Sequence, residues 1–305
     1  MLNAAATAVA SSLAFVRAHP LAAYLLTAVA FSWSDWLSLA ATGSRVIHGR
    51  LPTDMAGMAG PAFAAFAVTA IAGGEKGLKD LALRVVRVPL RSPWFWLLAP
   101  SPLWVGLATL GVLAVLGEPV PSAALLARYP GIPVLPLVTV FDLVVLGVGF
   151  GQEIGWRGLA LPRLQARRGP LGGALLLAVP WAVWLFPLLL VNNAWRGAGR
   201  EALAPLATGA LLLVAASVVL AFVVARTEGS IAAAALWHGS LRMGIATEGA
   251  NGVVGSVLVV AVVLGGVAVV AAELRARRTG YTLLLPSPRQ FDAAGAREGR
   301  ASARA

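Results

Sequence analysis

Apolar residues fill most of the chain in long blocks, which short polar or glycine- and proline-containing stretches separate. Eight blocks approach the length of about 17 to 25 residues that a helix needs to cross a bilayer. They cover residues 21–41, 55–73, 94–117, 132–150, 170–191, 206–225, 230–246 and 253–272. The pattern predicts an all-α fold, a polytopic membrane bundle of about eight transmembrane helices.

Composition supports this class. Hydrophobic residues make up 59% of the 305 residues and charged residues only 12%, whereas soluble domains carry roughly 25% charged residues. The chain contains no cysteine, which excludes disulfides and thiolate chemistry. A net charge of +11 would favour nucleic acid for a soluble protein, but in a membrane protein the placement of charge matters more than its sum. We expect membrane lipids as partners and no nucleic acid.

The basic residues predict an orientation. Two segments, 74–93 and 157–168, carry most of the positive charge between the apolar blocks. The positive-inside rule assigns both to the cytoplasm, and alternation along eight spans then places both termini there. The same alternation places Arg45, Arg50 and Arg128 outside.

The chain is divided on these grounds into N-terminal transmembrane helices (1–74), a transmembrane core (75–272) and a disordered cytoplasmic tail (273–305). The first apolar block lacks the pattern of a cleaved signal and is expected to be a true span. For Leu78 to Leu90 two interpretations stay open, an amphipathic helix on the membrane surface and a solvated basic loop. Asn192 and Asn193 are expected in a turn.

Potential chemistry is concentrated in two places. Gln152, Glu153 and Arg157 follow the fourth apolar block, and His238 and Arg242 lie one helical turn apart in the seventh. Ionisable groups within a membrane are costly, so they are usually functional and paired. Their side chains are therefore expected to converge.

Each of these residues has a structural and a chemical interpretation. Glu153 and Arg157 are four apart, which predicts an ion pair on one helical face. The alternative is that Glu153 acts as a displaced general base. His238 is interpreted as a neutral ring hydrogen-bonded between helices. Arg242 is expected either to neutralise Glu153 or to bind an anionic group. A guanidinium within a bundle needs a carboxylate, and Glu153 is the expected partner of Arg242.

Three blocks of sequence resemble the CAAX-protease and bacteriocin-processing (CPBP) family of intramembrane endopeptidases. Residues 149–158, followed by 161–165, are similar to the family's Glu-Glu-x-x-x-Arg motif and the run after it. Residues 181–188 resemble its aromatic-x-x-x-His block, and residues 229–242 resemble its His-x-x-x-Asn block. The resemblance covers about residues 75 to 245.

The resemblance implies a role for each matching position. In active members the first glutamate polarises the attacking water, the histidines support that water or a metal, and the asparagine stabilises the oxyanion. The first and second glutamates fall on Gln152 and Glu153, the arginine on Arg157, the histidines on Leu185 and His238, and the asparagine on Arg242. An amide is not a base at neutral pH, and leucine binds no metal. The resemblance thus implies an impaired peptidase centre with no cofactor. A divalent metal is expected only if the centre is active.

Three hypotheses about function follow. The first is a CPBP-like pseudoenzyme that binds a membrane-proximal peptide or protein. The second is a working endopeptidase that uses Glu153 and His238. The third is a transporter or channel subunit in which Arg242 and Glu153 line a path, although the inverted repeats typical of transporters are not evident. Arginine greatly outnumbers lysine and alanine is abundant, which points to a high-GC bacterial genome and hence the cell membrane.

Overall fold

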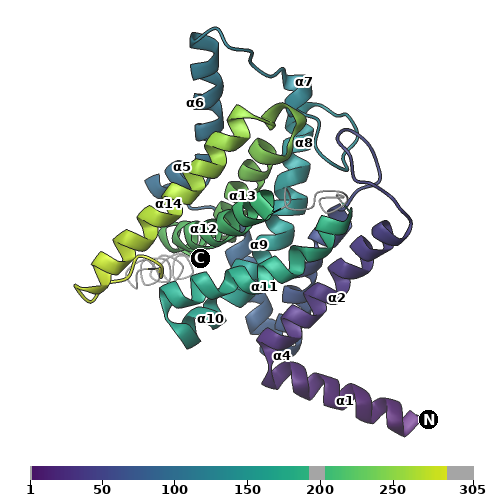
Figure 1. The fold of residues 1–305 in the computed structure, drawn as a ribbon. Helices are drawn as coiled ribbons and strands as arrows, with labels where there is room; N and C mark the ends of the chain where they lie inside the picture. The colour runs from purple at the N-terminus through teal and green to yellow at the C-terminus, as the bar shows by residue number, and fades with distance from the viewer. Residues whose placement is uncertain (1, 192–202, 287–305) are drawn as a thin grey trace, which may run out of the picture.

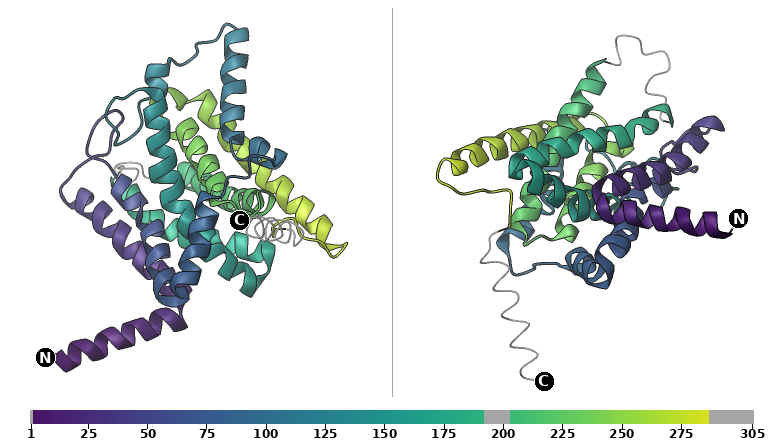
Figure 2. Two further views of the ribbon diagram at one scale, coloured as in Figure 1. Left: turned by 180° about the vertical axis from the view of Figure 1, so that it is seen from behind. Right: turned by 90° about the horizontal axis from the view of Figure 1, so that it is seen from below.

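The computed structural model describes residues 2–191 and 203–286, and within these ranges the fold is entirely helical, without a β-strand (Figure 1). The α-helices are α1 (Leu2–Ala18), α2 (Pro20–Ala41), α3 (Met55–Met58), α4 (Gly60–Val86), α5 (Pro93–Leu98), α6 (Ser101–Val115), α7 (Ala123–Leu126), α8 (Leu137–Val144), α9 (Gly151–Gly155), α10 (Leu161–Arg168), α11 (Pro170–Val191), α12 (Leu203–Arg226), α13 (Ile231–Ala246) and α14 (Val253–Arg277). Helix α1 projects away from the other helices (Figure 2).

The predicted membrane bundle is confirmed. Five helical segments of the described residues are long and apolar enough to cross a bilayer: Met55–Val86, Leu137–Arg168, Pro170–Leu188, Pro205–Arg226 and Val253–Arg277. The pair Val9–Ala18 and Pro20–Ala41, which bends by 115°, makes a sixth if the two helices are counted as one span. The two other predicted blocks contain the shorter helices α6 and α13, of 15 and 16 residues. The number of eight spans and the cytoplasmic position of both termini stay predictions.

The block predicted at 94–117 is not one helix. Helix α5 ends at Leu98 and α6 begins at Ser101, because Pro100 and Pro102 lack the amide hydrogens that a continuous helix would use and disfavour helical geometry before them.

The fourth block also differs from the prediction. Its helix was expected to end at residue 150, but it continues from Leu137 to Arg168, with π-helical turns at Val145–Phe150 and Trp156–Ala160 on either side of α9. Glycines near the expected end are packing positions. A Cβ at Gly149 would collide with the carbonyl oxygen of Ala235 on α13. The polar motif therefore lies within a helix, and Arg157 is not part of a cytoplasmic loop.

For the basic segment after the second block, the structure favours the helical interpretation. Helix α4 breaks at Gly74, where φ is 58°, and then continues to Val86. This continuation is not confined to a surface, since Leu81 is buried and Arg84 donates to the carbonyl oxygens of Gly158 at 3.0 Å and Arg157 at 3.1 Å.

Aromatic side chains form the core between α2, α11 and the π-helical turn Trp156–Ala160 that follows α9. The ring centroids of Trp36 and Trp184 lie 4.8 Å apart, those of Trp156 and Trp184 5.8 Å, and those of Tyr24 and Trp156 5.6 Å, all edge to face. Trp184 Nε1 donates to Ser32 Oγ at 2.8 Å. Edge-to-face rings are favourable beyond the area they bury, so this cluster joins the N-terminal helices firmly to the helix that carries Glu153.

The chain beyond α14 returns to the bundle. Helix α14 runs past the boundary expected at 272, and the carbonyl oxygen of Leu284, a buried residue, accepts a hydrogen bond from Gln165 Nε2 at 3.0 Å. Residues 273–286 are therefore folded rather than part of a disordered tail. The rest of the predicted tail, and Asn192 and Asn193, lie outside the described residues.

Candidate functional site

Glu153 on α9 and His238 on α13 form a direct contact. Oε1 of Glu153 lies 2.7 Å from Nδ1 of His238, and both side chains are buried. The expected convergence of the two polar segments is confirmed for this pair. A carboxylate at Nδ1 favours the tautomer that carries its proton on that nitrogen, which leaves Nε2 as the unprotonated nitrogen of a neutral ring.

Arg157 holds the other side of Glu153. Its Nη1 donates to Oε1 at 3.1 Å and lies at the same distance from Oε2. Both side chains are 0% exposed, and the guanidinium carbon of Arg157 is 4.4 Å from the ring centre of Trp181. The predicted ion pair is confirmed. A carboxylate that already interacts with a guanidinium and an imidazole is poorly placed to activate a water molecule.

Gln152 is buried and fixed by two neighbours. Its Oε1 accepts a hydrogen bond from Trp181 Nε1 at 3.1 Å, and its Nε2 lies 3.4 Å from Sδ of Met58. The amide is thus held in one orientation. Sequence reasoning singled out Gln152 but missed its partners; the position of Trp181 inside the second block was the available signal.

One cavity of about 170 Å³ brings several candidate residues together. It lies between α9, α11, α12 and α13 and is lined by Gln152, Leu185, His238 and Arg242, together with Met58, Trp181, Leu188, Gly209, Leu212, Leu213, Ala216, Trp237, Leu241 and Ile245. Glu153 and Arg157 are absent from this lining within the described residues. His238 therefore separates Glu153 from the cavity, and Glu153 and Arg242 do not line a common path there.

The expected pairing of Arg242 with Glu153 is wrong. Arg242 Nε donates instead to Tyr129 Oη at 3.2 Å, since the turn that separates Arg242 from His238 carries it beyond the occupied carboxylate. Asp54 is close enough to interact electrostatically but forms no ion pair with it. Burial raises the pKa of Tyr129, although Arg242 acts in the opposite direction. A neutral hydroxyl thus binds Arg242 without cancelling its charge. No sequence pattern had indicated Tyr129.

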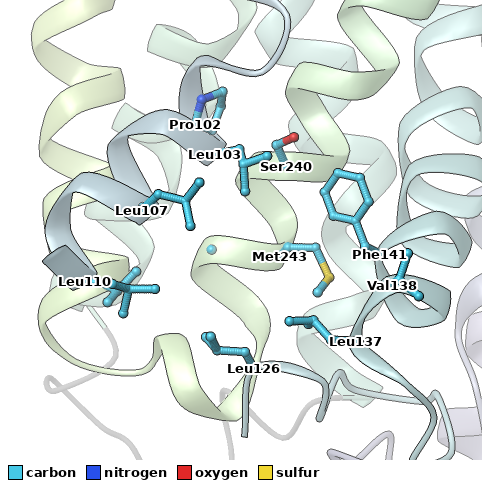
Figure 3. A pocket seen from close by; sticks show the side chains of 13 residues that line it. Pro102, Leu103, Leu107, Leu110, Leu126, Leu137, Val138, Phe141, Ser240 and Met243 are labelled. Carbon is cyan, nitrogen blue, oxygen red and sulfur yellow. The ribbon is translucent and has the colours of Figure 1, made fainter. Parts of the chain in front are cut away.

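A second, larger hollow of about 510 Å³ lies on another side of α13. Figure 3 shows Leu107 and Leu110 of α6 on one side of it, Phe141 and Val138 of α8 on the other, and Met243 of α13 between them. None of the described residues that line it is ionisable, so this hollow offers no acid or base.

Comparisons with known proteins match the part of the chain that contains these residues. Residues 133–243 match the model of the Rce1-like family, described as type II CAAX prenyl endopeptidase Rce1-like. This part of the chain is similar to the CAAX protease family. A stretch of 59 residues is 39% identical to CAAX prenyl protease 2 of Methanococcus maripaludis and covers 19% of this chain and 21% of that relative. The matched residues 133–243 contain all six positions discussed above, and the long apolar helices of the described residues are those of a membrane protein.

The side chains present do not fit a three-ligand catalytic metal site of the kind that a CAAX protease could use. Such sites take three protein ligands and leave a position open. Glu153 and His238 supply two, Leu185 occupies the position of the family's first histidine, and the described residues contain no cluster of three histidine, cysteine, aspartate or glutamate side chains. His48 is engaged elsewhere, with its Nε2 2.9 Å from the carbonyl oxygen of Ala246. No reaction step is therefore assigned to a metal.

Proposed function

We propose that this protein is a catalytically impaired member of the CAAX protease family that binds a membrane-proximal peptide or protein without hydrolysing it. The environment of Gln152 carries the proposal. The side chain at the position of the water-activating glutamate is an amide, held between Trp181 Nε1 and Met58 Sδ on the wall of the cavity. Because an amide does not accept a proton at neutral pH, this position offers no general base.

The surrounding residues do not replace the missing base. Glu153 interacts with Arg157 and His238 and lies behind the cavity wall. Leu185 adds an apolar surface where the family has a histidine, and Arg242 adds a positive charge where the family has an asparagine. A cavity with this lining is suited to binding a ligand that is mostly apolar with one polar end.

Peptide turnover by the purified full chain in detergent, measured together with its metal content, tests the proposal. We expect no cleavage of a membrane-proximal peptide library above background. CAAX prenyl protease 2 of Methanococcus maripaludis, in the same detergent, is the control for the assay. Cleavage by the unmodified chain that His238→Gln abolishes, with unchanged thermal unfolding, would contradict the proposal.

A working endopeptidase is the second candidate, and the 2.7 Å contact between Glu153 and His238 favours it. In this form His238 Nε2 is the general base toward a water molecule in the cavity and Glu153 orients the ring, as a carboxylate does in hydrolase triads. In that case His238→Gln abolishes peptide cleavage, whereas Gln152→Ala retains most of the activity. If the unmodified chain cleaves no peptide, this candidate is wrong.

We also propose that the protein resides in a bacterial cell membrane. The arginine- and alanine-rich composition supports a bacterial cell membrane as the site of the protein. Fractionation of a bacterial host expressing the chain tests this, because recovery outside the cell-membrane fraction would contradict it.

A further inference from the structure

Arg242 carries a charge that no ion pair with a described residue balances. No carboxylate lies within 4.0 Å of its nitrogens in the described part of the chain. Nε donates to Tyr129, and the two terminal nitrogens make no hydrogen bond to described residues. Asp54 offsets part of the charge, but only from a greater distance. A half-buried guanidinium in this state attracts an anion.

The cavity beside Arg242 limits which anion fits. Leu185, Leu188, Leu212 and Leu213 form an apolar wall, which favours a hydrocarbon group. Its volume of about 170 Å³ corresponds to only about five or six water-sized groups at roughly 30 Å³ each. Among the described lining residues, Arg242 is the one arginine or lysine, and the planar fork of a guanidinium matches the two oxygens of a carboxylate. A phosphate carries more negative charge than Arg242 alone balances, and the excess charge would lie against the leucine side chains.

We propose that this cavity binds an aliphatic carboxylate, with the carboxylate group on Arg242 and the hydrocarbon group against the leucine wall. The inference rests on the proposed function, because it assumes a cavity that binds rather than hydrolyses. His238 and Gln152 lie in the same lining and supply the polar contacts beside the apolar wall. The carboxylate belongs either to a free short-chain acid or to the C-terminus of a peptide with a branched aliphatic last residue.

Binding of 4-methylpentanoate and of 4-methylpentanamide to the purified full chain, measured by calorimetry in detergent, tests this inference. The two probes have the same hydrocarbon group and differ in charge. We expect the acid to bind roughly tenfold or more tightly than the amide, as charge-assisted hydrogen bonds outweigh neutral ones. Equal affinities, or no binding of the acid, overturn the inference.

Variants test whether Arg242 causes the preference for the acid over the amide. Arg242→Gln should remove the preference for the acid, while Gln can still donate a hydrogen bond to Tyr129. Arg242→Lys should retain part of it through its charge. Arg50→Gln is the matched control, because Arg50 is exposed in the loop whose Gly49 contacts Tyr129. A preference that survives Arg242→Gln, or that Arg50→Gln removes equally, overturns the assignment.

A peptide arm separates the two sources of the carboxylate. Peptides ending in leucine are compared as the free acid and as the C-terminal amide. Binding of the peptide acid but not the peptide amide identifies a peptide C-terminus, whereas binding of 4-methylpentanoate alone identifies a free acid. Peptide hydrolysis is monitored in the same samples. Hydrolysis contradicts the proposed function, while equal binding of acid and amide contradicts only the carboxylate inference.

Discussion

Glu153 and His238 are 85 positions apart in the chain, yet their side chains meet at 2.7 Å. Glycines allow this approach. Gly149 on the helix of Glu153 faces the Ala235 carbonyl, and a Cβ at Gly239 would lie 2.8 Å from Cα of Val145. The two helices are thus close enough for a short carboxylate and an imidazole to touch, and the site depends on backbone packing as much as on its polar residues.

Reversion of three positions should restore hydrolysis. Each of Gln152→Glu, Leu185→His and Arg242→Asn returns one group that the family resemblance assigns to the reaction, and each lost group costs on the order of 10² to 10³ in rate. The triple variant should therefore cleave a membrane-proximal peptide measurably, and each single variant should not. Trp181 Nε1 can donate to a glutamate at position 152, so the fold should tolerate that change.

The control for the reversion is the double variant Leu185→His with Arg242→Asn, which keeps Gln152 and should be inactive. A folded triple variant without activity would show that the loss does not lie in these three positions alone.

Removing the carboxylate of Glu153 should destabilise the protein strongly. Glu153→Gln leaves the buried cation Arg157 uncompensated, which costs about 3–5 kcal/mol in comparable buried pairs. Glu248→Gln is the matched variant, since Glu248 pairs with Arg128 at 2.9 Å with both side chains more than a third exposed, and such pairs contribute about 0–1 kcal/mol. Denaturant unfolding in detergent micelles measures both. Similar losses for the two variants would contradict a structural role for the buried pair.

The glycine contact between α13 and the helix of Glu153 predicts a packing effect. Gly149→Ala should destabilise the fold by about 1–3 kcal/mol, as overpacking does in other cores, because its Cβ meets the carbonyl of Ala235. Gly106→Ala on α6 is the control, since a Cβ there meets no atom within 4 Å and alanine favours helices. Denaturant unfolding compares the two variants. An unchanged free energy of unfolding for Gly149→Ala would show that the helices can separate at low cost.

The predicted orientation is open to a direct test, because the natural chain has no cysteine. Ala82→Cys, near Arg84, and Arg167→Cys are both at exposed positions and should react with an impermeant maleimide only from the cytoplasmic side. Arg50→Cys should react only from outside. Labelling of either of the first two from outside would overturn the eight-span topology.

The sequence predicted mainly local features of the structure. Glu153 and Arg157 are four apart, so helical geometry alone brings them together, and hydropathy located the helical blocks. The pairing of Arg242 was not readable, because Tyr129 reaches it from a distant loop. Glycine at 149 and 151 was ambiguous, since the same residue marks helix ends and close helix contacts. Only the positions of α13 and α3 in the fold decide between the two.

The return of the chain after α14 sets a practical limit for anyone who handles this protein. Leu284 is 1% exposed, and the backbone amide of Leu283 donates to Glu273 Oε2 at 2.7 Å. A truncated version that stops after Arg277 would uncover an apolar surface and leave the buried Glu273 with fewer donors. A fluorescent protein or affinity label is therefore best joined beyond Pro286, where the last described contacts of the chain have already been made.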